Sequence, residues 1–151
     1  MKKIFIYYSL TNNGDVVSDL FRDNGYDIRK VVTKKKYPKS KFLMIMTGGY
    51  KATFNKKDRL LGFDEEIKNY DKVVIGSPIW NDRLSAPINS VISLLDLKDK
   101  EVSFVFYSAS GNGNHAQEKV KELFNAKSIV LKEPKKNKEE LDRLREIIKN
   151  S

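Results

Sequence analysis

The chain contains no cysteine and a single histidine, His115, among its 151 residues. Without cysteine it can form no disulfide, no thiolate metal site and no cysteine nucleophile. One histidine also excludes a metal site that needs several histidine ligands. No apolar run approaches the roughly 20 residues that span a bilayer. The apolar run after Met1-Lys2-Lys3 stops at Tyr8, which is too short for an export signal. We therefore expect a cytoplasmic protein with no membrane span.

Positive charge is what the chain has in excess. Its 29 basic and 20 acidic residues give a formal net charge of +9. The densest basic run spans residues 34–41, and a second spans residues 135–138. Such runs attract nucleic acid, anionic membranes or acidic proteins, but they also occur as solvated loops. No motif that reads nucleic acid accompanies them, so we expect no nucleic-acid partner.

Five segments are predicted to be buried strands: residues 2–8, 26–32, 72–76, 101–107 and 127–131. Their apolar stretches are continuous rather than alternating, which is typical of a parallel sheet covered by helices on both faces. Apolar residues at helical spacing lie between these segments and after the last one. This alternation predicts one doubly wound α/β domain that spans residues 1–151.

About forty residues separate the second and third predicted strands, which is too many for a plain loop. Within them, residues 41–54 are rich in apolar side chains and contain Gly48-Gly49. We expect an interrupted helix there. The role of the whole segment, residues 33–63, stays open.

Three polar loops follow predicted strands at their carboxyl ends: residues 9–14, 76–83 and 108–115. In an open parallel sheet, ligands bind beyond these ends, where the strand order reverses. The first loop leads into a helix and offers hydroxyl, amide and backbone N–H groups, which is the outline of a phosphate cradle. The same residues also suit a polar turn that caps the helix.

These loops resemble those of the flavodoxin family, whose members bind FMN. The family's phosphate loop reads Ser/Thr-x-Thr-Gly-Asn-Thr, and Ser9, Thr11 and Asn13 match it. The most specific likeness is residues 74–80, with residues 85–88 behind them, which are similar to the family's third strand and flavin loop. Residues 42–60 also resemble a middle segment of one flavodoxin-like branch. The resemblance covers essentially the whole chain.

Two residues of the phosphate loop depart from the family pattern. Asn12 stands where the family has glycine, and Gly14 stands where it has threonine. Asparagine tolerates a positive φ better than other non-glycine residues, so we expect the turn to survive the first change. The second change removes one hydroxyl from the phosphate site.

The resemblance implies a five-stranded parallel sheet of order 2-1-3-4-5, with helices on both faces and FMN as the cofactor. It implies no catalytic residue and no metal. The residues that it assigns to FMN come from the three loops: Ser9, Leu10, Thr11, Asn12, Asn13, Gly14, Ser77, Pro78, Ile79, Trp80, Asn81, Asp82, Ser108, Ala109, Ser110, Gly111 and Asn112.

Several of these residues also have a plain structural interpretation. Trp80 would stack on the flavin ring or shield its edge, or it is an ordinary packed tryptophan. Asn81-Asp82 would line the flavin, or they form a turn that caps the next helix. Residues 108–112 would give backbone contacts to the pyrimidine end of the ring. His115 is expected to be a solvated residue of a helix's first turn rather than a base.

Three functions are compatible with this pattern. The resemblance favours an electron carrier that exchanges electrons with redox partner proteins, acidic ones included. The second is a small FMN-dependent NAD(P)H:quinone-type reductase, and the third is a flavodoxin-like fold that has lost FMN and acts as a binding module. Flavin content separates the third from the others, and NAD(P)H oxidation without an added reductase separates the second from the first.

Overall fold

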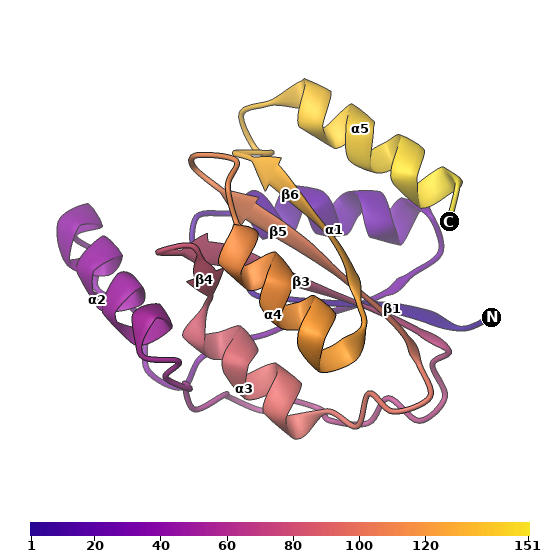
Figure 1. Cartoon of the computed structure of the whole chain (residues 1–151), viewed down its shortest axis with the longest axis horizontal. Helices are drawn as coiled ribbons and strands as arrows, with labels where there is room; N and C mark the ends of the chain where they lie inside the picture. The colour runs from indigo at the N-terminus through magenta and orange to yellow at the C-terminus, as the bar shows by residue number, and fades with distance from the viewer.

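A computed structural model describes all 151 residues and shows a parallel sheet with helices on both faces (Figure 1). The strands are β1 (Lys3–Tyr7), β2 (Asp27–Lys30), β3 (Lys72–Trp80), β4 (Arg83–Leu84), β5 (Glu101–Ser108) and β6 (Lys127–Lys132). The helices are α1 (Asn13–Asp23), α2 (Lys41–Thr53), α3 (Ala86–Leu94), α4 (Asn114–Phe124) and α5 (Lys138–Lys149). The predicted α/β fold class is confirmed.

The sheet has six strands, so the prediction of five strands in the order 2-1-3-4-5 is wrong. The parallel path runs β2-β1-β3-β5-β6, and the short strand β4 pairs with β3 alone. Asn81 and Asp82 both have positive φ, 50° and 60°, which turns the chain back so that Trp80 pairs antiparallel with Arg83. A two-residue turn of this kind forms a tight hairpin. As a result β3 continues to Trp80, through residues 76–80 that the sequence assigned to a loop.

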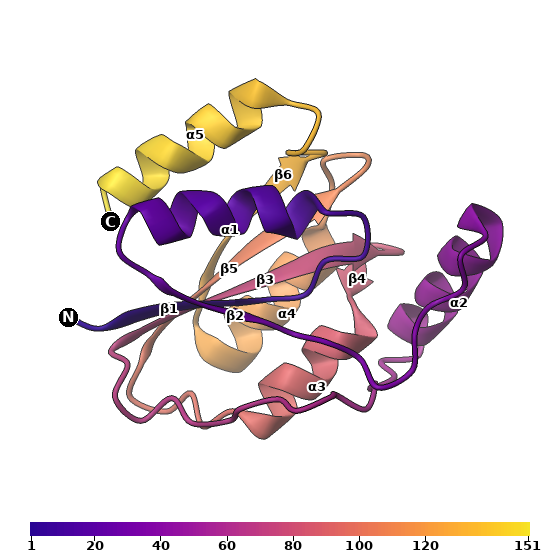
Figure 2. The same ribbon diagram turned by 180° about the vertical axis from the view of Figure 1, so that it is seen from behind.

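Each face of the sheet has its own apolar core. Helices α1 and α5 pack side by side on one face, over Phe5, Val74 and Leu131, as Figure 2 shows. Helices α3 and α4 cover the other face, over Ile75 and Phe106. Because the central strands β1, β3 and β5 are buried on both faces, both orientations of their side chains are mostly apolar, which explains the continuous apolar runs in these segments.

Helix α2 stands apart from both layers, beyond the edge of the sheet (Figures 1 and 2). It is one continuous helix, so the expected interruption at Gly48-Gly49 is wrong. Gly48 is needed for packing: a Cβ at this position would lie 3.1 Å from the ring of Trp80. The glycine therefore lets the helix approach the end of β3 closely.

The strand order reverses at β1. The chain passes from β1 to β2 on one side and then crosses to β3 on the other side of β1. Loops that leave the carboxyl ends of neighbouring strands diverge at such a point and leave a crevice. None of the helices is both long and apolar enough to cross a bilayer.

Candidate functional site

The loop of residues 9–14 connects β1 to α1 at the carboxyl edge of the sheet. Among the backbone N–H groups of residues 10–14, only that of Gly14 bonds within the chain, to Ser9 Oγ at 2.9 Å. The N–H groups of residues 10–13 therefore have no protein acceptor at the positive end of helix α1. Free donors in this position are what a phosphate group binds.

Gly14 lies where no side chain fits. A Cβ there would be 2.5 Å from Tyr107 Oη, 2.8 Å from Ser9 Cβ and 2.8 Å from Tyr7 Cδ2. The loop as it is folded here therefore requires glycine at this position. Asn12 has a φ of 67°, so the expectation that asparagine can supply the positive φ of this turn is confirmed.

Asp15 brings a negative charge into the first turn of α1, and a cation balances it. Its Oδ1 accepts hydrogen bonds from Tyr7 Oη at 2.6 Å and Lys30 Nζ at 2.7 Å. Burial raises the pKa of Asp15, but the bonds from Lys30 and Tyr7 outweigh it and lower the pKa below its ordinary value. Burial and the bond to Asp15 together raise the pKa of Tyr7 to about 12. The pairing with Lys30 limits the repulsion between Asp15 and an anion at the loop.

A cavity of about 540 Å³ opens between the β3–β4 hairpin and the loop after β5. Strands β3 and β5 are neighbours, so their carboxyl ends bring the two loops together. Apart from Ile79 and Ala109 the lining is polar, and it offers amide and hydroxyl groups that suit the polar edge of a heterocycle. The residues that line the cavity are Ile79, Asn81, Asp82, Ser108, Ala109, Ser110, Asn112 and Asn114. All of them except Asn114 belong to the predicted set.

The structure does not bring every predicted residue to this cavity. Ser77 and Pro78 are buried within β3, and Ser77 Oγ lies 2.9 Å from Ser85 Oγ. Gly111 has a φ of 81°, and its N–H donates to Ser108 Oγ at 2.9 Å, which closes the turn of the loop. Leu10 packs against the apolar core under α3 and α4.

Trp80 does not line the cavity either. Its ring lies against Gly48 of α2, and the ring centroids of Tyr8 and Tyr37 are 6.1 Å and 5.2 Å away. The residues on either side of it, Ile79 and Asn81, do line the cavity. Trp80 therefore links α2 to the hairpin that forms one wall of the cavity.

Lys135 joins the phosphate loop, although sequence analysis counted it only as part of a basic run. Its backbone N–H donates to Asn13 Oδ1 at 3.0 Å, and its charge helps to lower the pKa of Asp15. The contact joins residues 122 positions apart, so no local pattern predicts it. Only a general indication of this contact was present in the sequence. Residues 133–137 follow the carboxyl end of the last strand, and the other loops lie at the same edge of the sheet.

Two cations that form no ion pair, Arg83 of β4 and Lys119 of α4, lie close enough for their charges to interact. Arg83 Nη1 lies 3.0 Å from His115 Nε2, and Lys119 Nζ lies 3.2 Å from Asn55 Oδ1, while neither cation forms an ion pair. Burial and the charge of Arg83 lower the pKa of Lys119. The His115 Nδ1 atom is buried without a partner. His115 is thus half-buried and held by Arg83, rather than the solvated residue that we expected.

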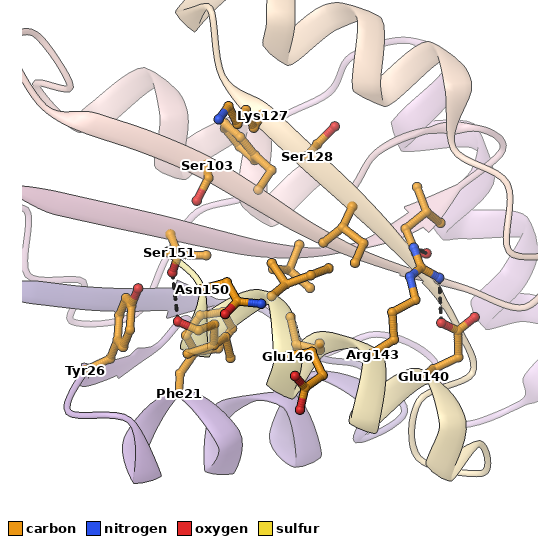
Figure 3. A pocket seen from close by; sticks show the side chains of 18 of the residues that line it. Phe21, Tyr26, Ser103, Lys127, Ser128, Glu140, Arg143, Glu146, Asn150 and Ser151 are labelled. Atoms are coloured by element: carbon orange, nitrogen blue, oxygen red, sulfur yellow. Dashed lines mark hydrogen bonds and ion pairs between the residues drawn. The ribbon is translucent and has the colours of Figure 1, made fainter.

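The larger of the two main cavities lies elsewhere, under α5 (Figure 3). It measures about 910 Å³ and reaches the amino ends of the strands, where Lys72 and Glu101 line it. Four of its six charged side chains pair with one another: Lys72 with Glu101 at 2.9 Å and Arg143 with Glu140 at 2.7 Å. Of the predicted residues it includes only Gly111. Because parallel sheets bind ligands at their carboxyl ends, the smaller cavity is the candidate site.

Comparison with known proteins identifies the family and the fold. Residues 14–139 match the sequence profile of the NADPH-dependent FMN reductase family. No curated protein matches the chain significantly. A candidate flavoprotein from Bacteroides uniformis ATCC 8492 is 20% identical, with a TM-score of 0.72 over 87% of this chain and 90% of that one.

Two further solved structures share the fold. The flavoprotein in complex with FMN from Lactobacillus acidophilus NCFM is 21% identical, with a TM-score of 0.64 over 85% of this chain and 90% of that one. Oxidised flavodoxin 1 from Bacillus cereus is 14% identical, with a TM-score of 0.54 over 98% of this chain and 95% of that one. At these identities the likeness establishes a flavodoxin-like fold. The expected resemblance to flavodoxins thus holds for the fold, and the profile match, which covers well over half of the sequence, gives the family. The chain belongs to the NADPH-dependent FMN reductase family.

Proposed function

We propose that this protein is an FMN-dependent reductase that takes electrons from NAD(P)H. The observation that carries the proposal is the polar cavity of about 540 Å³ at the carboxyl ends of β3 and β5, on the same edge of the sheet as the phosphate loop. Cavities of roughly 300–1,000 Å³ are typical of small-molecule sites. Family membership and the FMN complex of the Lactobacillus acidophilus neighbour support FMN as the cofactor.

The phosphate of FMN is held by residues 9–14. The N–H groups of residues 10–13 have no acceptor in the protein, and the hydroxyls of Ser9 and Thr11 add donors. The partial positive charge of the α1 N-terminus and the nearby Lys135 favour a dianion there. This loop fits a terminal phosphate better than the internal phosphates of FAD.

The ring of FMN is held by the hairpin and the loop after β5. When bound, FMN accepts a hydride from the nicotinamide and passes the electrons to an acceptor. Asn81 and Asp82 lie on one wall of the cavity, and Ser110, Asn112 and Asn114 lie on the other. Their side chains and backbone groups orient the ring by hydrogen bonds, while Trp80 keeps the hairpin against α2.

Arg83 and Lys119 supply contacts for the phosphates of NAD(P)H. Arg83 follows Asp82, a residue of the cavity wall whose carboxylate accepts a hydrogen bond from the N–H of His115 at 3.3 Å. Lys119 lies close enough to Arg83 for the two charges to interact. Two neighbouring positive charges without an acidic partner repel each other and disfavour each other's charged form. A bound anion offsets this repulsion. The pair therefore favours a phosphorylated nucleotide.

An electron carrier is the second candidate. It is favoured by the likeness to flavodoxin 1 from Bacillus cereus along 98% of this chain. A carrier of this kind would bind FMN through the same loops but would need a separate reductase to receive electrons. The two functions thus differ in whether the purified protein alone oxidises NAD(P)H.

The test is the steady-state oxidation of NADPH and of NADH by the FMN-loaded protein, with a quinone as acceptor and no other enzyme. A reductase oxidises nucleotide at a rate proportional to protein concentration. Arg83→Gln and Lys119→Gln should raise KM for the nucleotide, whereas Lys121→Gln, a change of the same charge on α4, should not. FMN-loaded protein that oxidises neither nucleotide would leave the electron carrier as the function.

A further inference from the structure

Residues 33–63 carry almost all of the protein's excess positive charge. They contain nine basic residues and one acidic residue, Asp58, which gives the segment a net charge of +8. The rest of the chain contains 20 basic and 19 acidic residues, so its own net charge is only +1. A surface that is charged for solubility alone has both signs interspersed. The concentration of charge in one segment therefore calls for another explanation.

The basic residues before and after α2 lie side by side in the folded protein. The N–H of Lys34 donates to the carbonyl of Arg59 at 2.8 Å, and the carbonyl of Lys56 accepts a hydrogen bond of 3.0 Å from Asn89 Nδ2 of α3. These bonds hold both parts of the segment between the base of α2 and helix α3 (Figures 1 and 2). We call the six cations gathered there the basic surface: Lys34, Lys35, Lys36, Lys56, Lys57 and Arg59.

The cations of the basic surface have no acidic partner within the protein. All six side chains are exposed, and none of them forms an ion pair. The one acidic side chain of the segment, Asp58, is only 10% exposed and is bound by Lys51 at 2.6 Å and by the Tyr37 hydroxyl. The field of the six cations is therefore not cancelled locally, and it attracts an acidic partner.

The basic surface is joined to the wall of the candidate flavin cavity. Thr53, three residues before Lys56, accepts a hydrogen bond of 2.6 Å at its Oγ1 from Asn81 Nδ2, and Asn81 lines the cavity. Asn55, next to Lys56, accepts a hydrogen bond of 3.2 Å at its Oδ1 from Lys119 Nζ of α4. A protein that binds to the basic surface is thereby held beside the hairpin that forms one side of the cavity.

We propose that the basic surface docks an acidic protein that carries a redox centre and accepts electrons from the flavin. The inference rests on the proposed function and names the class of acceptor. One reduced FMN supplies two electrons, which reduce two molecules of a one-electron acceptor protein, while its two protons pass to water. The docking surface is made by this chain's own lysines, so it can be tested by binding as well as by electron transfer.

The composition of the basic surface favours a protein partner over a nucleic acid. Five of its six cations are lysines, and Arg59 is the only arginine. Arginine forms the bidentate bonds that hold phosphates, whereas the hydrated ammonium group of lysine attracts a partner without fixing its geometry. Electrostatic complementarity of this kind speeds the encounter of two proteins more than it tightens their complex. A short-lived complex suits an acceptor that must leave after each electron.

The experiment measures the binding of plastocyanin, an acidic one-electron carrier, to the FMN-loaded protein by isothermal titration calorimetry. Binding is expected at low salt. The dissociation constant should rise about tenfold or more at physiological ionic strength, where charges are screened beyond about 8 Å. Cytochrome c, a basic one-electron carrier, should not bind. Both partners are oxidised in this titration, so the result does not depend on NADPH.

Charge variants test whether binding occurs at the basic surface. Replacing Lys34, Lys35, Lys56 and Lys57 together by Gln should weaken the binding of plastocyanin about tenfold at low salt. The matched control removes the same charge by replacing four exposed lysines elsewhere by Gln: Lys68, Lys98, Lys127 and Lys138. The control should weaken binding by no more than about twofold. Because every replaced side chain is exposed, both variants should keep the wild-type melting temperature and FMN content.

Three results would overturn the proposal. The first is a wild-type protein that does not bind plastocyanin at low salt. The second is a control variant that loses as much affinity as the variant of the basic surface. The third is tighter binding to phosphatidylglycerol vesicles or to duplex DNA than to plastocyanin, which would assign the basic surface to a lipid or a nucleic acid. Failure of the proposed function is detected separately, as bound flavin that NADPH does not reduce, whether or not plastocyanin binds.

Discussion

The backbone N–H of Lys135 donates a hydrogen bond of 3.0 Å to Oδ1 of Asn13, joining the loop before α5 to the loop before α1. The side chain of Asn13 is thereby anchored by its oxygen, and its Nδ2 is directed to Thr11 Oγ1, 3.5 Å away. The phosphate loop therefore depends on the far end of the chain for its shape. A basic residue is brought beside the loop by the same contact.

Removal of this anchor should weaken the binding of FMN but not that of riboflavin, which has no phosphate. We expect Asn13→Ala and Thr11→Ala each to reduce FMN affinity by about 1–3 kcal/mol, because each removes a hydrogen bond to a charged group or to the loop that holds it. Flavin titrations of the apoprotein measure the effect. Asn69→Ala, at an exposed position outside the three loops, is the control. Riboflavin that binds wild-type protein as tightly as FMN does would contradict the phosphate assignment.

Gly14 and Gly49 form a matched pair for a test of the crowding at the phosphate loop. A methyl group at Gly14 would overlap Tyr107, Ser9 and Tyr7, whereas nothing lies within 4 Å of a Cβ at Gly49. Gly14→Ala should destabilise the fold by about 1–3 kcal/mol. Gly49→Ala should stabilise helix α2 by up to about 1 kcal/mol, because alanine is the better helix former. Urea unfolding measures both, and equal stability of Gly14→Ala and wild type would show that the loop can relax around the methyl group.

Trp80 is the only tryptophan of the chain, and both of its neighbours in sequence line the candidate cavity. FMN in that cavity should therefore quench most of the tryptophan fluorescence. The emission of the apoprotein during titration with FMN is the measurement. If the flavin-saturated protein keeps its full tryptophan emission, the flavin ring lies away from the β3–β4 hairpin.

The pairing of Asp15 with Lys30 should make stability depend on acidity. Since the folded protein lowers the pKa of Asp15, the pairing stabilises the fold above the ordinary carboxyl pKa of about 4 and is lost as pH falls through the lower folded value. Asp15→Asn should reduce the free energy of unfolding at pH 7 more than at pH 3. Asp99 is exposed and forms no ion pair, so Asp99→Asn should change the free energy of unfolding by the same small amount at pH 7 and at pH 3. If Asp15→Asn lowers the free energy of unfolding as much at pH 3 as at pH 7, the ion pair with Lys30 is not the cause of the loss.

The central parallel strands β1, β3 and β5 could be predicted because most of their side chains are buried on both faces and therefore apolar. Strand β4 could not, since only the positive φ of both Asn81 and Asp82 turns Arg83-Leu84 back onto β3. The continuity of α2 was missed for a similar reason. Gly48 serves a packing contact with Trp80, which lies 32 positions away, and does not break the helix.

The candidate site was predictable where one loop supplies several neighbouring residues. Asn81 and Asp82 follow β3, and Ser108, Ala109, Ser110 and Asn112 lie at or after the end of β5, so strand ends alone bring them to one cavity. Ser77 does not reach this cavity, because β3 extends past it and buries its hydroxyl against Ser85. Lys135 was missed because its contact with Asn13 exists only once the sheet is assembled.

The most direct test of the central claim is the anaerobic reduction of the bound flavin by NADPH. Protein loaded with one equivalent of FMN is mixed with one equivalent of NADPH, without any other enzyme, and the visible absorbance of the oxidised flavin is followed. A reductase should bleach the flavin fully, and more slowly when Arg83 or Lys119 is replaced by Gln. Flavin that stays oxidised until a separate reductase is added would contradict the proposed activity.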